Sequence, residues 1–111
     1  MFSEQIAMLP ELSQRTGLRE EDLRMIIDTL SGKVDNAWIF GSRAKGTYHK
    51  GSDIDIAVSG DGLTQDIVLL VSDILNEELP MPYFFDVVLK SEISNQELLE
   101  HIERVAVPIL G

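Results

Sequence analysis

The stretch "IFGSRAKGTYHKGSDIDIAV", residues 39–58, decides the fold of this 111-residue chain. It begins in a short apolar and aromatic segment, 36–40, that runs straight into Gly41 and Ser42. It ends in a segment, 53–58, where acidic or small residues alternate with isoleucine and valine. A short apolar run and a period of two are both typical of strands. The stretch therefore predicts two strands, joined by a turn with a short helical piece and a loop.

Helical patterns flank these two strands. Apolar residues recur at helical spacing over 19–31 and again over 64–78, and residues 83–90 form a third apolar segment typical of a strand. Pro10 suits the first turn of a helix, so the front of the chain is predicted to be helical in two short pieces, ending at Gly17. Ser94 and Glu97 form a capping-box pattern that predicts the start of a last helix.

The order of these elements predicts an α/β (α+β) fold with a small mixed sheet of three or four strands, flanked by helices. The connection 46–51 is too short for a parallel crossover helix and longer than a tight hairpin, so a mixed sheet is expected. We expect one domain over 1–111, with N-terminal helices in 1–32, a catalytic core in 35–90, and a C-terminal helix and tail in 94–111.

Composition narrows the functional classes. Nineteen acidic residues against nine basic ones give a formal net charge of −10, which would repel a phosphate backbone, so autonomous binding of long nucleic acid is not expected. The absence of cysteine excludes disulfides and thiolate metal sites. No apolar run is long enough for a membrane span and no basic leader pattern opens the chain, so we expect a cytoplasmic protein.

Three aspartates are candidate metal ligands. Residues two apart on a strand project from the same face, so Asp53 and Asp55 should present their carboxylates together. Asp86 lies in the apolar run "FFDVV", on a strand that could lie beside the first pair. Oxygen ligands without cysteine or a histidine cluster favour Mg²⁺, and two ions are possible. The alternative is an ordinary half-exposed strand, on which acids alternate with apolar residues without any function.

The residues before these acids could bind phosphate. The glycine of Gly41-Ser42 allows close approach to the backbone, the serine adds a hydroxyl donor, and the helical turn that follows favours an anion. Arg43 could clamp a phosphate through its guanidinium, and Lys45 could act as a point charge. The alternative is a plain strand-to-helix turn with solvated basic residues. His49 is interpreted as a solvent-exposed loop residue, and His101 as a surface or edge residue of the last helix.

Gly-Ser followed about ten residues later by Asp-x-Asp resembles the signature of the DNA polymerase beta-like nucleotidyltransferase superfamily, and specifically its minimal nucleotidyltransferase (MNT) branch. The order of the flanking elements is similar to the whole MNT domain. The resemblance implies the polymerase-beta-like fold and an Mg²⁺-dependent transfer of a nucleoside monophosphate, AMP from ATP above all, to a protein hydroxyl. The site residues that it implies are Gly41, Ser42, Arg43 and Lys45 at the triphosphate, Asp53 and Asp55 on the metals, and Asp86 on one metal and as the base.

The MNT branch is similar to MntA-type antitoxins, which are encoded beside a HEPN-domain ribonuclease toxin. The resemblance thus implies a HEPN partner, neutralised by binding and by transfer of AMP to a tyrosine. Two alternatives stay open: a nucleotide-binding antitoxin that neutralises its partner without catalysis, and nucleotidyl transfer to RNA or to a small molecule. A homodimer or a hetero-oligomer is also possible.

The tail "RVAVPILG" leaves apolar residues after the last predicted helix, which Pro108 should stop. We expect this tail to pack back on the core of the domain. The alternative is an interface with a second copy or a partner.

Overall fold

The structure, a computed structural model, describes residues 2–111, with side chains described from residue 6 onward. Its centre is a four-stranded sheet in the order β3-β2-β1-β4, formed by β1 (Asn36–Phe40), β2 (Ile54–Ser59), β3 (Phe85–Leu89) and β4 (Val107–Leu110). β1 pairs antiparallel with both β2 and β4, whereas β2 and β3 are parallel. The predicted α/β class with a small mixed sheet is confirmed.

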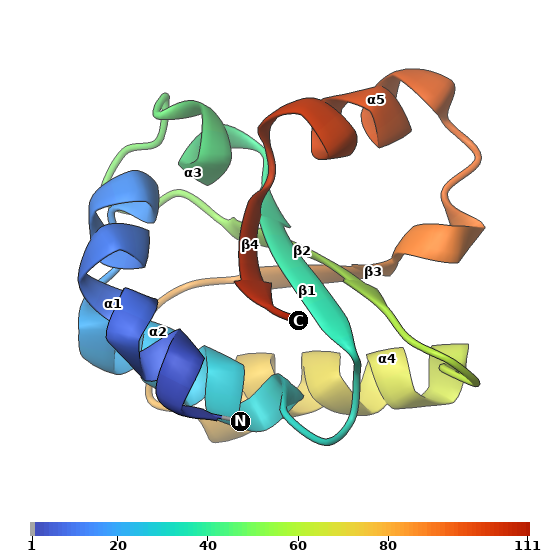
Figure 1. Cartoon of the computed structure of the whole chain (residues 1–111), viewed down its shortest axis with the longest axis horizontal. Helices are drawn as coiled ribbons and strands as arrows, with labels where there is room; N and C mark the ends of the chain where they lie inside the picture. The colour runs from blue at the N-terminus through green and yellow to red at the C-terminus, as the bar shows by residue number, and fades with distance from the viewer. Residues whose placement is uncertain (1) are drawn as a thin grey trace.

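Helices cover both faces of this sheet. They are α1 (Phe2–Thr16), α2 (Glu20–Leu30), α3 (Ser42–Lys45), α4 (Gln65–Asp73) and α5 (Gln96–Val105), with a π-helical turn η1 (Ile74–Glu78) that continues α4 and a 3₁₀ turn η2 (Lys90–Glu92) after β3. Figure 1 shows α1, α2 and α4 on one side of the sheet and α5 on the other. Within residues 2–111, no helix combines the length and the apolar character needed to cross a membrane.

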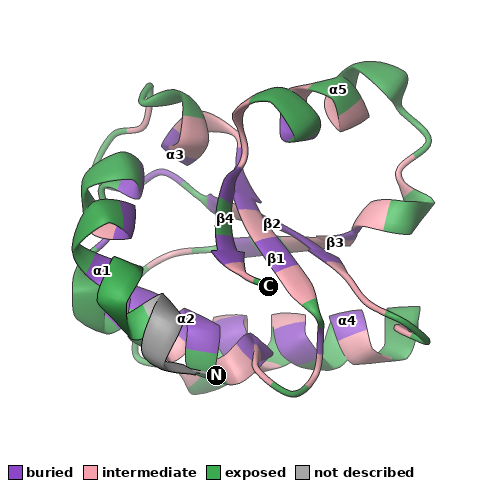
Figure 2. Cartoon of the chain, viewed as in Figure 1, coloured by how far each residue is buried: buried purple, intermediate pink, exposed green. Residues whose placement is uncertain are grey.

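The alternation in β2 divides the interior in two. Ile54, Ile56 and Val58 are fully buried in the larger core, which they share with apolar residues of α1, α2 and α4. Ala57 points the other way and joins Phe40 and Ile102 in a smaller cluster beneath α5. Figure 2 shows the buried strands at the centre and the mostly exposed outer surface of α5. The polar positions of β2 thus lie on the α5 face, where the apolar cover is thin.

Two predictions about the helices differ from the structure. The helical front is one continuous helix, α1, with Pro10 inside it, because buried Leu9 and Leu12 anchor the segment to the core while Pro10 faces solvent. The last helix is capped by Asn95, whose side chain accepts from the Leu98 amide at 3.0 Å, and not by the adjacent serine. Asparagine is as good an N-cap as serine, and with Asn95 as the cap the helix begins one residue later than predicted.

The tail packs back on the sheet, as expected, but as a strand that was not predicted. β4 adds to the free edge of β1 and buries Val107 and Ile109 in the larger core. Pro108 is exposed on this edge strand, which has β1 as its one neighbour. An edge position tolerates a proline because one side of the strand has no ladder partner.

Candidate active site

The Gly41-Ser42 turn lies between β1 and α3 and touches the second strand. Gly41 has φ 74° and ψ −150°, a conformation that is essentially restricted to glycine. A Cβ added at Gly41 would overlap Asp55 Oδ2 and lie 3.3 Å from the Asp55 carboxyl carbon. Glycine is therefore required here both by the backbone and by the space that Asp55 occupies, and the turn is packed directly against a carboxylate.

The three predicted aspartates gather at one end of the sheet. Asp55 of β2 pairs in register with Asp86 of β3, and both point to the α5 face because their neighbours along each strand face the larger core. Asp53 precedes the first residue of β2. Burial raises the pKa of Asp55 above its ordinary value, and the charges of Asp86 and then Asp53 raise it further. The structure thus brings the three carboxylates within electrostatic range of one another.

The donor set suits a hard divalent cation. Carboxylate oxygens are the ligands that Mg²⁺ prefers, and a cation would relieve the mutual repulsion that raises the pKa of Asp55. Among the described residues, however, no three acidic or histidine side chains already converge on a point that could hold a metal ion. Asp55 is half-buried, whereas Asp53 and Asp86 are exposed, so two of the three side chains have room to change rotamer.

Arg43 lies in an environment that its sequence motif did not suggest. Its side chain is only 2% exposed, and its guanidinium donates to the carbonyl oxygens of Thr16 (3.2 Å), Lys50 (3.4 Å) and Ser52 (3.4 Å). These contacts tie the end of α1 to the loop between α3 and β2. The structure thus gives Arg43 a bracing position beneath the turn, instead of the predicted phosphate-facing one.

Two aromatic rings complete the surroundings of Arg43. Its guanidinium carbon lies 4.9 Å from the centroid of Tyr48 and 5.2 Å from that of Tyr83, distances at which a cation is attracted to a ring face. Tyr48 in turn packs against Gly17, where a Cβ would overlap its ring. Carbonyl oxygens and ring faces therefore stabilise the buried charge. The loop that leads to Asp53 is held by Arg43, which contacts its carbonyl oxygens, and by Tyr48, which packs against Gly17.

The remaining predicted phosphate ligands, Ser42 and Lys45, lie at the two ends of α3. Ser42 is half-buried and opens α3, while Lys45 is exposed at its end. The Gly41 carbonyl accepts from the amides of Ala44 and Lys45, both at 3.1 Å, so the short helix is closed onto the glycine. The structure therefore brings Ser42 and Lys45 to the same turn as Gly41.

His101 was interpreted as a surface or edge residue, and the structure gives it a partner that the sequence did not reveal. It is half-buried on α5, and its Nε2 accepts a hydrogen bond of 3.2 Å from the Gly41 amide. Burial lowers the pKa of His101, and the charges of Lys45 and Arg104 lower it further. The one signal in the sequence was its spacing of three residues from Leu98, which places the two side chains next to each other on the last helix.

Asn76 is a second residue whose role the sequence did not reveal. From the π-helical turn η1, its Oδ1 accepts from the Phe85 amide at 2.8 Å and its Nδ2 donates to the Phe85 carbonyl at 2.9 Å. Phe85 directly precedes Asp86 and presents these two backbone groups on the side of β3 away from β2. Asn76 thus fixes the start of the strand that carries the third carboxylate.

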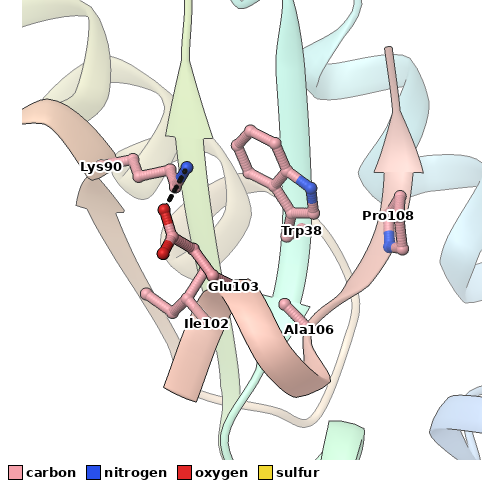
Figure 3. Close-up of a pocket in the computed structure, with 6 residues that line it drawn as sticks. All are labelled: Trp38, Lys90, Ile102, Glu103, Ala106 and Pro108. Carbon is pink, nitrogen blue, oxygen red and sulfur yellow. Dashed lines mark ion pairs between the residues drawn. The ribbon is translucent and has the colours of Figure 1, made fainter. Parts of the chain in front are cut away.

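A separate cavity of about 280 Å³ lies farther along the α5 face. Trp38 and Ile102 line it together with Lys90, Glu103, Ala106 and Pro108 (Figure 3). Lys90 Nζ lies 5.0 Å from the Trp38 ring centroid and 3.9 Å from Glu103 Oε2. None of the predicted site residues lines this cavity, and its lysine is already engaged, so we do not include it in the site.

Comparison with known families agrees with this geometry. The family model described as Polymerase beta, Nucleotidyltransferase matches residues 21–111, which include all the predicted site residues. The chain belongs to this polymerase beta nucleotidyltransferase family. The membership confirms the resemblance seen in the Gly-Ser and Asp-x-Asp signature, and the polymerase-beta-like fold with it. No curated protein sequence matches the chain.

Solved structures place this nucleotidyltransferase beside toxin-antitoxin proteins. A crystal structure of a toxin-antitoxin with AMP-PNP matches with a TM-score of 0.63 and 25% identity, over 85% of this chain and 74% of that one. A mutant of the toxin-antitoxin MntA-HpeT matches with the same TM-score and coverage at 23% identity, and so shares the fold. A nucleotidyltransferase from Sulfolobus solfataricus matches with a TM-score of 0.45 and 21% identity, over 96% of this chain and 83% of that one.

Proposed function

We propose that the chain is an Mg²⁺-dependent nucleotidyltransferase that moves AMP from ATP onto a hydroxyl of a protein partner. We further propose that it acts in the cytoplasm as the antitoxin of a HEPN-domain ribonuclease toxin. The observation that carries this proposal is the packing of the Gly41 turn against Asp55, with Asp86 in register beside it. This contact joins a surface suited to phosphate with a cluster of carboxylates, as nucleotidyl transfer requires.

In the proposed site, the triphosphate contacts Ser42 and approaches the chain closely at Gly41, where no side chain intervenes. Lys45 adds a positive charge from its exposed position. The role of Arg43 is revised to that of a brace, since its donors are directed to carbonyl oxygens of the chain itself. Because these contacts hold the turn from below, removal of Arg43 should affect nucleotide binding through the shape of the turn.

The reaction that we propose is an attack of the acceptor hydroxyl oxygen on the α-phosphorus of ATP. A new bond forms between that oxygen and the α-phosphorus, the bond from the α-phosphorus to the bridging oxygen of the β-phosphate breaks, and pyrophosphate leaves with the bonding electrons. Asp86 takes the hydroxyl proton, which is the third family role carried over to this chain. Asp53, Asp55 and Asp86 would hold Mg²⁺, which would supply positive charge against the phosphate oxygens.

The proposed partner is supported by likeness and by charge. The chain is 25% identical to a toxin-antitoxin protein crystallised with AMP-PNP, with a TM-score of 0.63. A formal net charge of −10 favours association with a basic protein, and an RNA-cleaving toxin has to bind a polyanion. A protein acceptor therefore fits this chain better than RNA does.

The test is co-expression of the chain with the product of its neighbouring gene, which we propose to be the HEPN-domain partner, followed by the intact mass of that product. We expect an added AMP with the wild type and none with Asp55→Asn. The matched control is Asp28→Asn, an exposed aspartate of α2 outside the site, which should transfer AMP at the wild-type level.

The alternative is neutralisation by binding alone. A partner of unchanged mass that is nevertheless inhibited equally by the wild type and by an Asp53→Asn, Asp55→Asn, Asp86→Asn variant would contradict catalysis. An adduct that persists in Asp55→Asn would contradict the assignment of the carboxylates instead.

A further inference from the structure

The contact between His101 and Gly41 joins two points 60 residues apart in the sequence. The imidazole is held there by a second contact: its ring meets the Phe40 ring edge-on, with centroids 6.4 Å apart and planes at 74°. Phe40 is the last residue of β1 and is almost fully buried. The histidine is therefore positioned by the strand end that leads into the Gly41 turn, and is not a free surface side chain.

The two peptide groups of Gly41 have different partners. The carbonyl side is held by the amides of α3, at 3.1 Å each, whereas the amide side is held by His101 of α5. A glycine lacks the Cβ that would restrict its backbone, so the hydrogen bonds at its two peptide groups, together with the packing against Asp55, hold its conformation. The imidazole supplies one of the two, and it does so on the face of the sheet where Asp55 lies.

The protonation state of the histidine suits this role. An imidazole nitrogen accepts a hydrogen bond only in the neutral ring, with the proton on the other nitrogen. Burial together with the nearby charges of Lys45 and Arg104 disfavours the imidazolium form of His101, since the pKa of the ring is lowered. The neutral acceptor is thus the form that this environment stabilises.

We infer that His101 is a positioning residue for nucleotide binding: by accepting the Gly41 amide from α5, it holds the Gly41-Ser42 turn in the conformation that packs against Asp55. The inference rests on the proposed function, because it assigns the turn to the triphosphate of ATP. It also connects α5, which packs over the smaller apolar cluster on the Asp55 face of the sheet, to the candidate site through a hydrogen bond.

Three variants separate the hydrogen bond from packing. His101→Phe keeps an aromatic ring beside Phe40 but has no acceptor, whereas His101→Gln keeps an acceptor oxygen and loses the ring. Glu100→Gln, an exposed neighbour on α5, is the matched control. Each variant is measured for the affinity of AMP-PNP with Mg²⁺ by calorimetry, for kcat/KM of AMP transfer, and for melting temperature.

We expect His101→Phe to weaken AMP-PNP binding and to lower kcat/KM by about five- to tenfold, the effect of one hydrogen bond. We expect His101→Gln to stay within about twofold of the wild type, and Glu100→Gln to match it. In ¹⁵N-labelled wild type, a scalar coupling across the hydrogen bond should join the Gly41 amide nitrogen to Nε2 of His101, and it should be absent from His101→Phe.

Two results overturn the inference. One is wild-type affinity in His101→Phe, and the other is an equal loss in His101→Gln, which would show that packing and not the acceptor matters. Absence of the scalar coupling in the wild type has the same consequence. A wild type that binds AMP-PNP in a His101-dependent way but transfers nothing overturns only the proposed function, whereas active transfer without His101 dependence overturns only this inference.

Discussion

Asp55 of β2 and Asp86 of β3 lie opposite each other, in register on neighbouring parallel strands and on the same face of the sheet. Neighbouring strands in a sheet are about 4.8 Å apart, so the backbones that carry the two carboxylates are separated by a single strand spacing. Asp55 is also half-buried, and burial is the largest cause of its raised pKa, ahead of the charges of Asp86 and Asp53. The candidate site therefore gathers three carboxylates where burial and mutual repulsion disfavour the ionised form of Asp55.

Replacing Asp55 with asparagine should stabilise the protein while it abolishes transfer. The ordinary pKa of the carboxyl is 3.8, and the folded state raises it, so the folded state binds the proton more tightly than the unfolded state. Stability is therefore lost as the pH rises from 3.8 through the raised pKa, and the deficit persists at neutral pH. Chemical denaturation at pH 7 should show Asp55→Asn to be more stable than the wild type, with a difference that shrinks toward pH 3.8.

The control for this measurement is Asp28→Asn, which removes an exposed acid of α2 and should change stability by less than about 0.5 kcal/mol. A less stable Asp55→Asn at pH 7 would contradict the repulsion that we assign to the three carboxylates.

Alanine at Gly41 should be costly to the fold and to the site. The backbone conformation at φ 74° and ψ −150° costs a non-glycine residue about 1–3 kcal/mol, and the new Cβ would displace the Asp55 carboxylate. Gly46→Ala is the matched control, because Gly46 also has a positive φ of 79° but meets no atom within 4 Å. Denaturation should place Gly41→Ala well below Gly46→Ala, and comparable losses would argue against the contact with Asp55.

Lysine at position 43 should destabilise the protein by roughly 3 kcal/mol, because a single ammonium cannot replace the planar guanidinium among three carbonyl oxygens and two ring faces. Arg24→Lys, an exposed change on α2, should be neutral. Urea denaturation of both variants tests this. If Arg43→Lys were stable yet bound nucleotide poorly, the original phosphate-facing assignment of Arg43 would regain support.

Alanine at Asn76 should cost about 2 kcal/mol, because both hydrogen bonds to the Phe85 backbone are lost. Since Phe85 precedes Asp86, we also expect slower AMP transfer than the loss of stability explains, measured at a temperature where the variant is fully folded. Glu77→Ala, an exposed change in the same turn, should leave both properties unchanged. Full activity in Asn76→Ala would show that Asp86 does not depend on this anchor.

The fold was largely predictable because its elements have strong periodic patterns. The alternation around Asp55 and the apolar run before Gly41 each predicted a strand that the structure contains. β4 was missed since four residues around Pro108 have no periodicity of their own, and only their place beside β1 makes them a strand. Pro10 was taken as a break because local propensity cannot weigh the burial of the residues around it.

The candidate site also combines features that local sequence patterns predict with features that depend on long-range contacts. The Asp53 and Asp55 pair and the Gly-Ser turn were predictable because their spacing along the chain translates directly into a shared face and a shared turn. Asp86 was predicted from its apolar strand segment and from the family resemblance, since its place beside Asp55 depends on the pairing of β2 with β3. The burial of Arg43 and the contact of His101 with Gly41 depend on partners 27 and 60 residues away, which no local pattern specifies. Long-range packing decides what such side chains do.

The position of β4 also determines when this site can form during synthesis. β1 lies inside the sheet, between β2 and β4, so one of its edges has no partner until the residues up to Leu110 have been made. A nascent chain that ends at Leu89 already carries the three carboxylates and the glycine turn, but it lacks α5 with its histidine. The acids are thus synthesised before the helix that carries His101, so we expect the turn to reach its final conformation only after α5 has been made.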